Sequence, residues 1–277
     1  MSWLFPYPGG KSLIAPELVT YFPAHHCYVE PFAGSLAVLL AKWESPVEVI
    51  NDRDGDLMHF FRMLKAAGSE EDLLQKLVYW GENTPHHRDL YTDWWAQWRK
   101  GYRPEDPVER AMQWYYLKVL SVNGKSGWAH SKEDNKAEVW QQHVHHLGKA
   151  VRRLRRTQME SKDARDVLVQ WDGPEVLFYC DPPYLGVQDA ADYYPGAPPW
   201  TLLDHHHLAE VLNRVQGKVV LSYYPHALLD EWYSGWRRVT IKVKKMSQGA
   251  HTGNVKEEAE ELLLCNFEPL PLLTLAL

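Results

Sequence analysis

The chain has 277 residues, of which 45% are hydrophobic and 24% are charged, and its formal net charge is −6 at pH 7. This composition is typical of a globular protein with one large domain, or with a core domain that carries an inserted one. No apolar segment approaches membrane-spanning length, and the first residues lack the basic start and apolar run of a signal peptide. The negative charge counts against a nucleic-acid substrate unless Lys and Arg gather locally at the binding face.

The first residues after the start, FPYPGGKS from Phe5 to Ser12, predict a tight loop that leads into a helix beginning near Leu13. The Gly-Gly-Lys-Ser ending is similar to that of a nucleotide-binding P-loop. However, Phe5 stands where that motif needs a glycine, and no apolar strand precedes the loop. The pattern therefore excludes an NTPase, but it still offers backbone N–H groups and the cation of Lys11, which suit a carboxylate.

The next stretch predicts a strand, a glycine turn, a helix and a second strand, at residues 27–30, 31–35, 36–43 and 47–50. The second strand ends in Asn51-Asp52. A carboxylate at this position is typical of dinucleotide-binding folds, where it accepts two hydrogen bonds from a ribose diol. Gly34 is the one glycine of the usual three in the turn, and this favours a nucleoside ligand without a pyrophosphate.

The middle of the chain, residues 57–157, reads as mostly helical, with apolar residues at helical spacing over 58–67, 73–80, 88–100 and 108–122. Asn123-Gly124 then predicts a tight turn, from which Lys125 and Trp128 would project. We expect four other tryptophans of this segment to belong mainly to its core: Trp94, Trp95, Trp98 and Trp114.

The densest positive cluster of the chain is KAVRRLRR, at residues 149–156. On a helix, one face would carry Lys149, Arg152, Arg153 and Arg156. Such a face is either simply solvated or contacts the phosphates of a nucleic acid, and the sequence leaves both interpretations open.

The central motif of the chain is the apolar run at residues 176–180 followed by Asp181-Pro182-Pro183-Tyr184. The run predicts a buried strand, and ligands bind at the carboxyl ends of such strands in open α/β sheets. The two prolines fix the backbone and donate no hydrogen bonds. The Asp181 carboxylate and the Pro182 carbonyl can then accept the two N–H bonds of a planar amine, while the Tyr184 ring stacks on it.

In this order, FPYPGGK, EPFAGS, a strand ending in Asn51-Asp52, and DPPY resemble the Dam-type (class α) DNA adenine-N6 methyltransferases. The resemblance implies an α/β fold with a Rossmann-like, S-adenosylmethionine-dependent methyltransferase sheet. It places the catalytic domain at residues 1–56 and 158–277, and an inserted helical target-recognition subdomain at 57–157. The sequence departs from the family at Leu36, which occupies the second glycine position of the turn.

The resemblance also implies a role for individual residues, and it makes double-stranded DNA the partner. The predicted catalytic residues are Asp181, Pro182 and Tyr184. The residues predicted to bind S-adenosylmethionine are Tyr7, Lys11, Phe32, Gly34, Asp52, Asp163, Ala164 and Asp181. The residues predicted to contact nucleic acid are Lys125, Trp128, Lys149, Arg152, Arg153 and Arg156. The target adenine would have to flip out of the duplex.

Other features bear on the setting of the protein. Cys27, Cys180 and Cys265 lie in apolar stretches without a pairing pattern, which predicts buried thiols in a reducing compartment. The histidines occur in adjacent runs, not at the spacings of metal sites, so we expect no metal. We expect a monomer or weak dimer in the cytoplasm of a bacterial cell or of a bacteriophage host, without membrane contact.

Three alternatives remain at this point. Methylation of cytosine N4 uses the same geometry, although those enzymes more often carry Ser where Asp181 stands. An RNA adenine methyltransferase is a second alternative, and glutamine methyltransferases, which resemble Asn-Pro-Pro-Tyr, are a more distant one. The third is a DNA-binding relative that has lost its activity.

Overall fold

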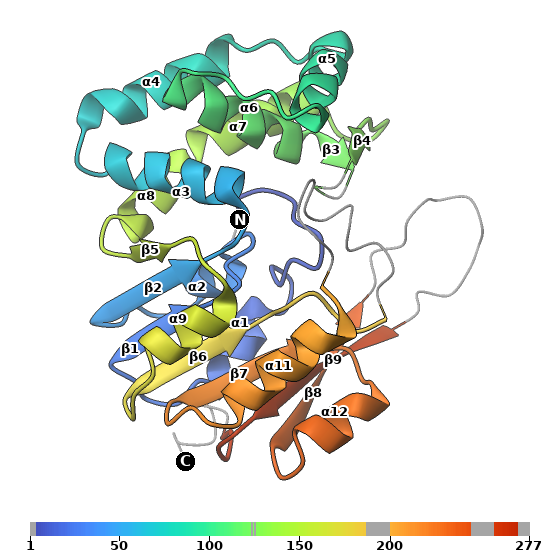
Figure 1. The fold of residues 1–277 in the computed structure, drawn as a ribbon. Helices are drawn as coiled ribbons and strands as arrows, with labels where there is room; N and C mark the ends of the chain where they lie inside the picture. The colour runs from blue at the N-terminus through green and yellow to red at the C-terminus, as the bar shows by residue number, and fades with distance from the viewer. Residues whose placement is uncertain (1–3, 123, 125, 187–199, 245–257, 271–277) are drawn as a thin grey trace.

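The computed structural model describes residues 4–122, 124, 126–186, 200–244 and 258–270 (Figure 1). The centre of the fold is a seven-stranded sheet in the order β5-β2-β1-β6-β7-β9-β8. The five strands from β5 to β7 run parallel, whereas β9 runs antiparallel to both of its neighbours. In chain order the strands are β1 (Cys27–Glu30), β2 (Val47–Asn51), β5 (Gln158–Glu160), β6 (Val176–Cys180), β7 (Lys218–Tyr223), β8 (Arg237–Lys244) and β9 (Glu258–Cys265).

The strand order reverses at β1, because the chain passes from β1 to β2 and β5 on one side and later to β6 and β7 on the other. Cys27 of β1 lies opposite Val47 of β2 and Val176 of β6, so the three parallel strands begin at the same edge of the sheet. In open α/β sheets, ligands bind outside the carboxyl ends of the strands at such a reversal. The fold therefore predicts a ligand-binding site at the residues that follow β1 and β6.

Alternation of side chains along each strand gives the sheet two apolar faces. One face, which includes Val29 and Phe178, packs against α9 (Ala164–Gln170), α11 (Leu202–Leu212) and α12 (Ala227–Trp232). Figure 1 shows these three helices in front of the sheet.

The other face of the sheet, which includes Tyr28 and Leu177, packs against α1 (Ala15–Leu18) and α2 (Ala37–Ala41). The same hydrophobic cluster continues into the helices of the middle segment. Those helices are α3 (Gly55–Ala67), α4 (Glu71–Asn83), α5 (Arg88–Arg99), α6 (Pro107–Val119), α7 (Lys136–His145) and α8 (Leu147–Leu154).

The middle helices and the amino-terminal loop meet in an aromatic core. The ring of Phe5 lies 6.0 Å from that of Phe60 in α3 and 5.1 Å from that of Trp114 in α6. Aromatic pairs at such distances add to the stability that burial provides. Because this core is continuous with one face of the sheet, the division into a catalytic domain and an inserted subdomain stays a functional prediction.

A short antiparallel hairpin, β3 (Ser121–Val122) and β4 (Ser126–Trp128), follows α6 and confirms the predicted turn. Gly124 in this turn has a φ of 72°, which glycine adopts without strain. In Figure 1 the hairpin lies at the right of the helical part, whereas α8 lies at the left.

The sequence predicted the main elements correctly, including the mixed α/β class and the strands at β1, β2 and β6. The predicted helix after the amino-terminal loop begins at Ala15, and the one predicted from Leu36 begins at Ala37. Among the described residues, no helix has the length and apolarity needed to cross a membrane.

Candidate active site

A cavity of about 900 Å³, including its open mouth, lies at the carboxyl ends of β1 and β6. Three segments far apart in the sequence line the cavity. They are the amino-terminal loop from Tyr7 to Lys11, the turn from Phe32 to Ser35 after β1, and Asp181 to Tyr184 after β6.

The amino-terminal loop and the turn after β1 approach each other closely at Gly34. A Cβ at Gly34, whose φ is 47°, would lie 3.1 Å from the ring of Tyr7. The loop itself is closed by a hydrogen bond from the Gly10 N–H to the Tyr7 carbonyl, 2.9 Å long. The absence of a side chain at Gly34 therefore lets the Tyr7 ring form one wall of the cavity.

Leu36 adopts the left-handed conformation that the expected glycine would have allowed, with φ 59° and ψ 21°. Its side chain is fully buried in the core and is not among the residues that line the cavity. The neighbours Ser35 and Ala37 line the cavity instead. The departure from the family pattern thus leaves the shape of the turn and the space in front of it intact.

Asp52, at the end of β2, is buried and fixes the turn after β1. Its carboxylate accepts a hydrogen bond from the Gly34 N–H at 3.1 Å and another from the Asp54 N–H at 3.0 Å. Burial and the nearby Asp54 carboxylate raise the pKa of Asp52 to about 7. A second buried acid, Glu30, lines the cavity floor, and burial raises its pKa to about 8.

Lys11 and Asp181 form an ion pair inside the site. The Lys11 Nζ lies 2.7 Å from Asp181 Oδ1 and 2.8 Å from Oδ2, and it also donates to the Gly9 carbonyl at 2.8 Å. Burial opposes the charge of Lys11, but the carboxylates of Asp181 and Glu261 outweigh this effect and raise the pKa of Lys11 above its ordinary value. The Lys11 ammonium is therefore charged and held beside the DPPY motif.

Tyr184 contacts two carboxylates. Its hydroxyl lies 2.9 Å from Asp181 Oδ1 and in close contact with Oε1 of Glu261, near the amino end of β9. The sequence pattern did not indicate Glu261 as a site residue. Because β9 runs antiparallel and Leu262 pairs with Tyr223 at the end of β7, Glu261 lies at the same edge of the sheet as the ends of the parallel strands, and no local sequence signal specifies this.

Asp163 and Ala164, predicted to border the cofactor, do not line the cavity. Asp163 caps α9 by accepting a hydrogen bond from the Arg165 N–H, and it pairs with the Arg165 guanidinium at 2.7 Å. The preceding residue, Lys162, exchanges hydrogen bonds with the Asn51 side chain. Asp163 thus lies near the end of β2 but is engaged in structural contacts.

Of the hairpin residues predicted to contact nucleic acid, Lys125 lies outside the described residues. Trp128 is half-buried, with its ring 4.5 Å from that of His86 and 5.4 Å from that of Tyr91. It is therefore packed on the helical part and exposes only part of its ring.

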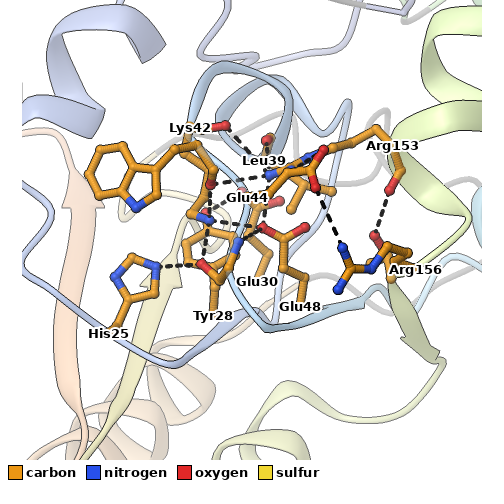
Figure 2. A network of polar contacts seen from close by, with 12 residues as sticks. His25, Tyr28, Glu30, Leu39, Lys42, Glu44, Glu48, Arg153 and Arg156 are labelled. Atoms are coloured by element: carbon orange, nitrogen blue, oxygen red, sulfur yellow. Dashed lines mark hydrogen bonds and ion pairs between the residues drawn. The ribbon is translucent and has the colours of Figure 1, made fainter.

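The predicted basic face around α8 is divided in the structure. Lys149, Arg152 and Arg156 are exposed. Arg153 instead has a side chain only 10% exposed, and it pairs with Glu48 of β2 at 2.8 Å. As Figure 2 shows, Arg153 belongs to a polar network with Glu44, Glu48 and Lys42 that joins α8 to the sheet.

The network in Figure 2 explains why Arg153 is not available to a phosphate in this arrangement. Its guanidinium also donates to the Leu39 carbonyl at 3.0 Å. The Lys42 ammonium, whose side chain is fully buried, shares the Glu48 carboxylate at 2.9 Å. A buried carboxylate held by two cations is a structural arrangement, so we leave Arg153 out of the proposed contact with DNA.

Among the residues described by the structure, no group of three or more His, Cys, Asp or Glu side chains is placed to hold a metal ion. The three cysteines are free and buried, as predicted.

The chain matches a known enzyme family over residues 7–248, and the family is that of D12 class N6 adenine-specific DNA methyltransferases. It belongs to this family and is a DNA adenine methyltransferase. It is 24% identical over 269 residues to the Retron Ec67 DNA adenine methylase of Escherichia coli, covering 94% of this chain and 90% of that protein. It is 26% identical over 257 residues to the DNA adenine methylase of Haemophilus influenzae, covering 86% of this chain and 85% of that protein.

Proposed function

We propose that the protein transfers a methyl group from S-adenosylmethionine to N6 of an adenine flipped out of duplex DNA, at the cavity between β1 and β6. The observation that carries this proposal is the position of Asp181, Pro182 and Tyr184 at the rim of that cavity. There, two acceptor groups and an aromatic ring lie at the reversal of the strand order, where the fold binds ligands.

The residues around the cavity fit S-adenosylmethionine. The cavity opens to solvent and is lined by both polar and aromatic groups, which suits a nucleoside with an amino-acid arm. Lys11 offers a cation to a carboxylate. Asp52 is not among the residues that line the cavity, but it accepts a hydrogen bond from Gly34, which does, and it would offer an acceptor to a ribose diol bound beside that turn. Tyr7 and Phe32 add aromatic surface, and Gly34 keeps the turn close to the ligand. A contact of Lys11 with the cofactor would replace part of its pairing with Asp181. The bound cofactor supplies a methyl group that is already activated by a sulfonium.

Asp181 and Pro182 are suited to hold the target amine. A carboxylate has about four acceptor positions. In Asp181, Lys11 contacts both oxygens and Tyr184 contacts Oδ1, so Oδ2 keeps capacity for one N–H of the amine. The Pro182 carbonyl is a second acceptor. Two such hydrogen bonds would orient the amine so that its lone pair points toward the methyl group.

Tyr184 offers a ring to the flipped base. Extruding a base costs a few kcal/mol. Stacking on an aromatic side chain returns about 1–3 kcal/mol per base. The hairpin with Trp128 and the exposed cations Lys149, Arg152 and Arg156 are the proposed contacts with the duplex. We further propose a monomer or weak dimer that works in a reducing cytoplasm, with which the three free cysteines agree.

The role of the cavity is tested by replacing Asp181. Asp181→Ala should abolish methyl transfer to duplex DNA while the protein remains folded, because the amine loses its main acceptor. Glu175→Ala is the matched control, since Glu175 is exposed just before β6, at the far end of the same strand. If Asp181→Ala transfers methyl groups at a rate near that of the unmodified protein, the proposed site is wrong.

A further inference from the structure

Glu261 is a buried acid inside the site that the proposed function does not yet use. Its side chain is 5% exposed, and it comes from β9, the one strand of the sheet that runs against its neighbours. Its carboxylate contacts the Tyr184 hydroxyl and lies 3.5 Å from the Lys11 ammonium. It is thus connected to the reacting group Asp181 through a single hydroxyl.

The hydrogen bonds of this cluster cannot all be made with the protons that the resting site holds. The Tyr184 hydroxyl has one proton, yet it lies between the carboxylates of Asp181 and Glu261, and neither carboxylate can donate while ionised. Lys11 supplies one positive charge to two acids. One additional proton would allow all of these hydrogen bonds to form, because a protonated Asp181 could donate to Tyr184 while Tyr184 donates to Glu261.

We propose that Glu261 is the terminal acceptor for the proton that the target amine loses, and that it acts through the Tyr184 hydroxyl. This inference rests on the proposed function. Glu261 is a positioning residue in this scheme, since it also holds the Tyr184 hydroxyl and with it the orientation of the ring.

The proton balance of this step is simple. As the methyl group arrives, the adenine nitrogen develops a positive charge, and one of its N–H bonds breaks in the same step. The electron pair of that bond returns to the nitrogen, and the proton goes to Oδ2 of Asp181. Rotation of the resulting carboxylic acid group turns this proton toward the Tyr184 oxygen, which accepts it as Tyr184 gives its own proton to Glu261. The amine ends neutral, Asp181 returns to a carboxylate, and Glu261 becomes a carboxylic acid that later loses its proton to solvent.

The surroundings of Glu261 suit an acceptor. Burial raises the pKa of Glu261, Lys11 opposes this effect, and the Asp181 carboxylate adds to it, so that the pKa lies above its ordinary value. The titratable groups that face it are Lys11, Asp181, Tyr184 and, on β6, Tyr179. A carboxylate of raised pKa binds a proton more readily than an exposed one, and the Lys11 ammonium opposes this effect without reversing it.

The test measures single-turnover methyl transfer from S-adenosylmethionine to duplex DNA, as a function of pH, for Glu261→Gln, Tyr184→Phe and the double variant. We expect each single change to slow transfer by at least about tenfold, as loss of a proton acceptor does. The double variant should be no slower than the slower single one, because both changes break the same chain. Binding of S-adenosylhomocysteine should stay within about threefold, since less than 1 kcal/mol is then at stake.

The pH profile separates a proton acceptor from a merely structural residue. In the unmodified protein the rate should rise as Glu261 ionises, at a pH above the ordinary range of a glutamate, and both variants should lose this rise. Glu260→Gln is the matched control, because Glu260 is the exposed neighbour on the same strand and should behave as the unmodified protein. Should Glu261→Gln fail to fold, Tyr184→Phe, which keeps the ring, decides the question alone.

The proposal is overturned if Glu261→Gln transfers at the unmodified rate with an unchanged pH profile, or if the slowing in the double variant is the product of the two single effects. A failure of the proposed function itself would look different, since the unmodified protein would then form no N6-methyladenine at any pH.

Discussion

Leu36 is the residue at which this chain departs most clearly from the pattern of its family. A left-handed conformation costs a non-glycine residue about 1–2 kcal/mol. Full burial of a leucine side chain contributes about 1.5–3 kcal/mol. Because Leu36 is completely buried in the core, the two effects are of similar size, and the turn keeps its shape without the glycine. The strain is thus offset within the same residue.

The ionisation of Asp52 predicts a pH dependence of cofactor binding. Its pKa is raised to about 7, and only the carboxylate can accept two hydrogen bonds while donating none. The affinity for S-adenosylhomocysteine should therefore increase as pH rises through 7. Asp52→Asn should lower the affinity about tenfold at pH 8, as expected for the loss of a hydrogen bond to a charged group, and should remove this increase. Calorimetry at pH 6 and pH 8 measures both effects.

The same ionisation acts on stability with the opposite sign. Because the folded pKa of Asp52 lies above its unfolded value, its contribution to stability is complete below about pH 4 and is lost as pH rises through about 7. The neighbouring Glu30, with a pKa of about 8, should continue this loss. An affinity that does not change with pH in the unmodified protein would contradict the role of Asp52.

At the scale of single residues, the sequence predicted the acids that end a parallel strand and missed the one on β9. Asp52 and Asp181 follow apolar runs directly, so their position at the carboxyl edge of the sheet could be predicted. Glu261 begins an apolar run, and its place in the site depends on β9 running antiparallel, which the local pattern does not specify. Arg153 was predicted to lie on an outward basic face and to contact nucleic acid, because the sequence does not show that Glu48 lies beside it.

The hairpin that is proposed to contact DNA lies against the amino-terminal loop that lines the cavity. A Cβ at Gly124 would lie 2.1 Å from the Pro6 carbonyl oxygen and 3.1 Å from the Tyr7 Cα. The buried Lys118 ammonium of α6 donates to the Gly124 carbonyl at 3.4 Å and lies 5.8 Å from the Tyr7 ring. The turn of the hairpin thus rests directly on one wall of the cavity.

This contact predicts that a change in the hairpin turn alters cofactor binding. Gly124→Ala must displace either the hairpin or the Tyr7 loop, so it should lower the affinity for S-adenosylhomocysteine by about tenfold, equivalent to about 1.4 kcal/mol. Gly127→Ala is the matched control, because Gly127 also has a positive φ but open space around it. Equal effects of the two changes in equilibrium binding would show that backbone strain, not the contact with Pro6, is responsible.

The ion pairs of α8 predict that Arg153 contributes to stability, whereas Arg152 contributes to DNA binding. Arg153→Ala leaves Glu48 with Lys42 as its remaining cation, so we expect it to destabilise the protein by about 2 kcal/mol, as loss of a hydrogen bond to a charged group does. Arg152→Ala changes an exposed residue of the same helix and should alter stability by less than about 0.5 kcal/mol. Denaturant unfolding compares the two variants.

The same pair of variants tests the proposed contact with phosphates. If the exposed face of α8 lies on DNA, Arg152→Ala should weaken binding equally for all sequences and reduce its dependence on salt. A change in stability for Arg152→Ala as large as that for Arg153→Ala would contradict the division seen in the structure.

At the scale of elements, long apolar runs were predictable and short or charged strands were not. The strand β6 is a continuous apolar run, and β1 and β2 are mostly apolar segments bounded by turns. By contrast, β5 has three residues, and β8 is a charged strand at the edge of the sheet. Charged side chains protect such edges from pairing with other chains, so β8 reads as a basic surface segment when its neighbours are unknown.

For the whole molecule, one hydrophobic cluster extends from the sheet into the middle helices, so the cavity and the helical part are built on a common core. Because the net charge is −6, DNA binding must depend on local clusters of Lys and Arg side chains. In Figure 1, α8, which carries the exposed Lys149 and Arg152, lies at the left and the hairpin at the right, so a duplex that touches both would have to pass along the helical part.

The most direct test of the proposed reaction is transfer of a labelled methyl group from S-adenosylmethionine to unmethylated duplex DNA, followed by digestion to nucleosides. We predict that the label appears in N6-methyladenine alone, and that Asp181→Ala yields none. Label in N4-methylcytosine, or in N6-methyladenine formed equally well by Asp181→Ala, would contradict the site and the chemistry assigned to it.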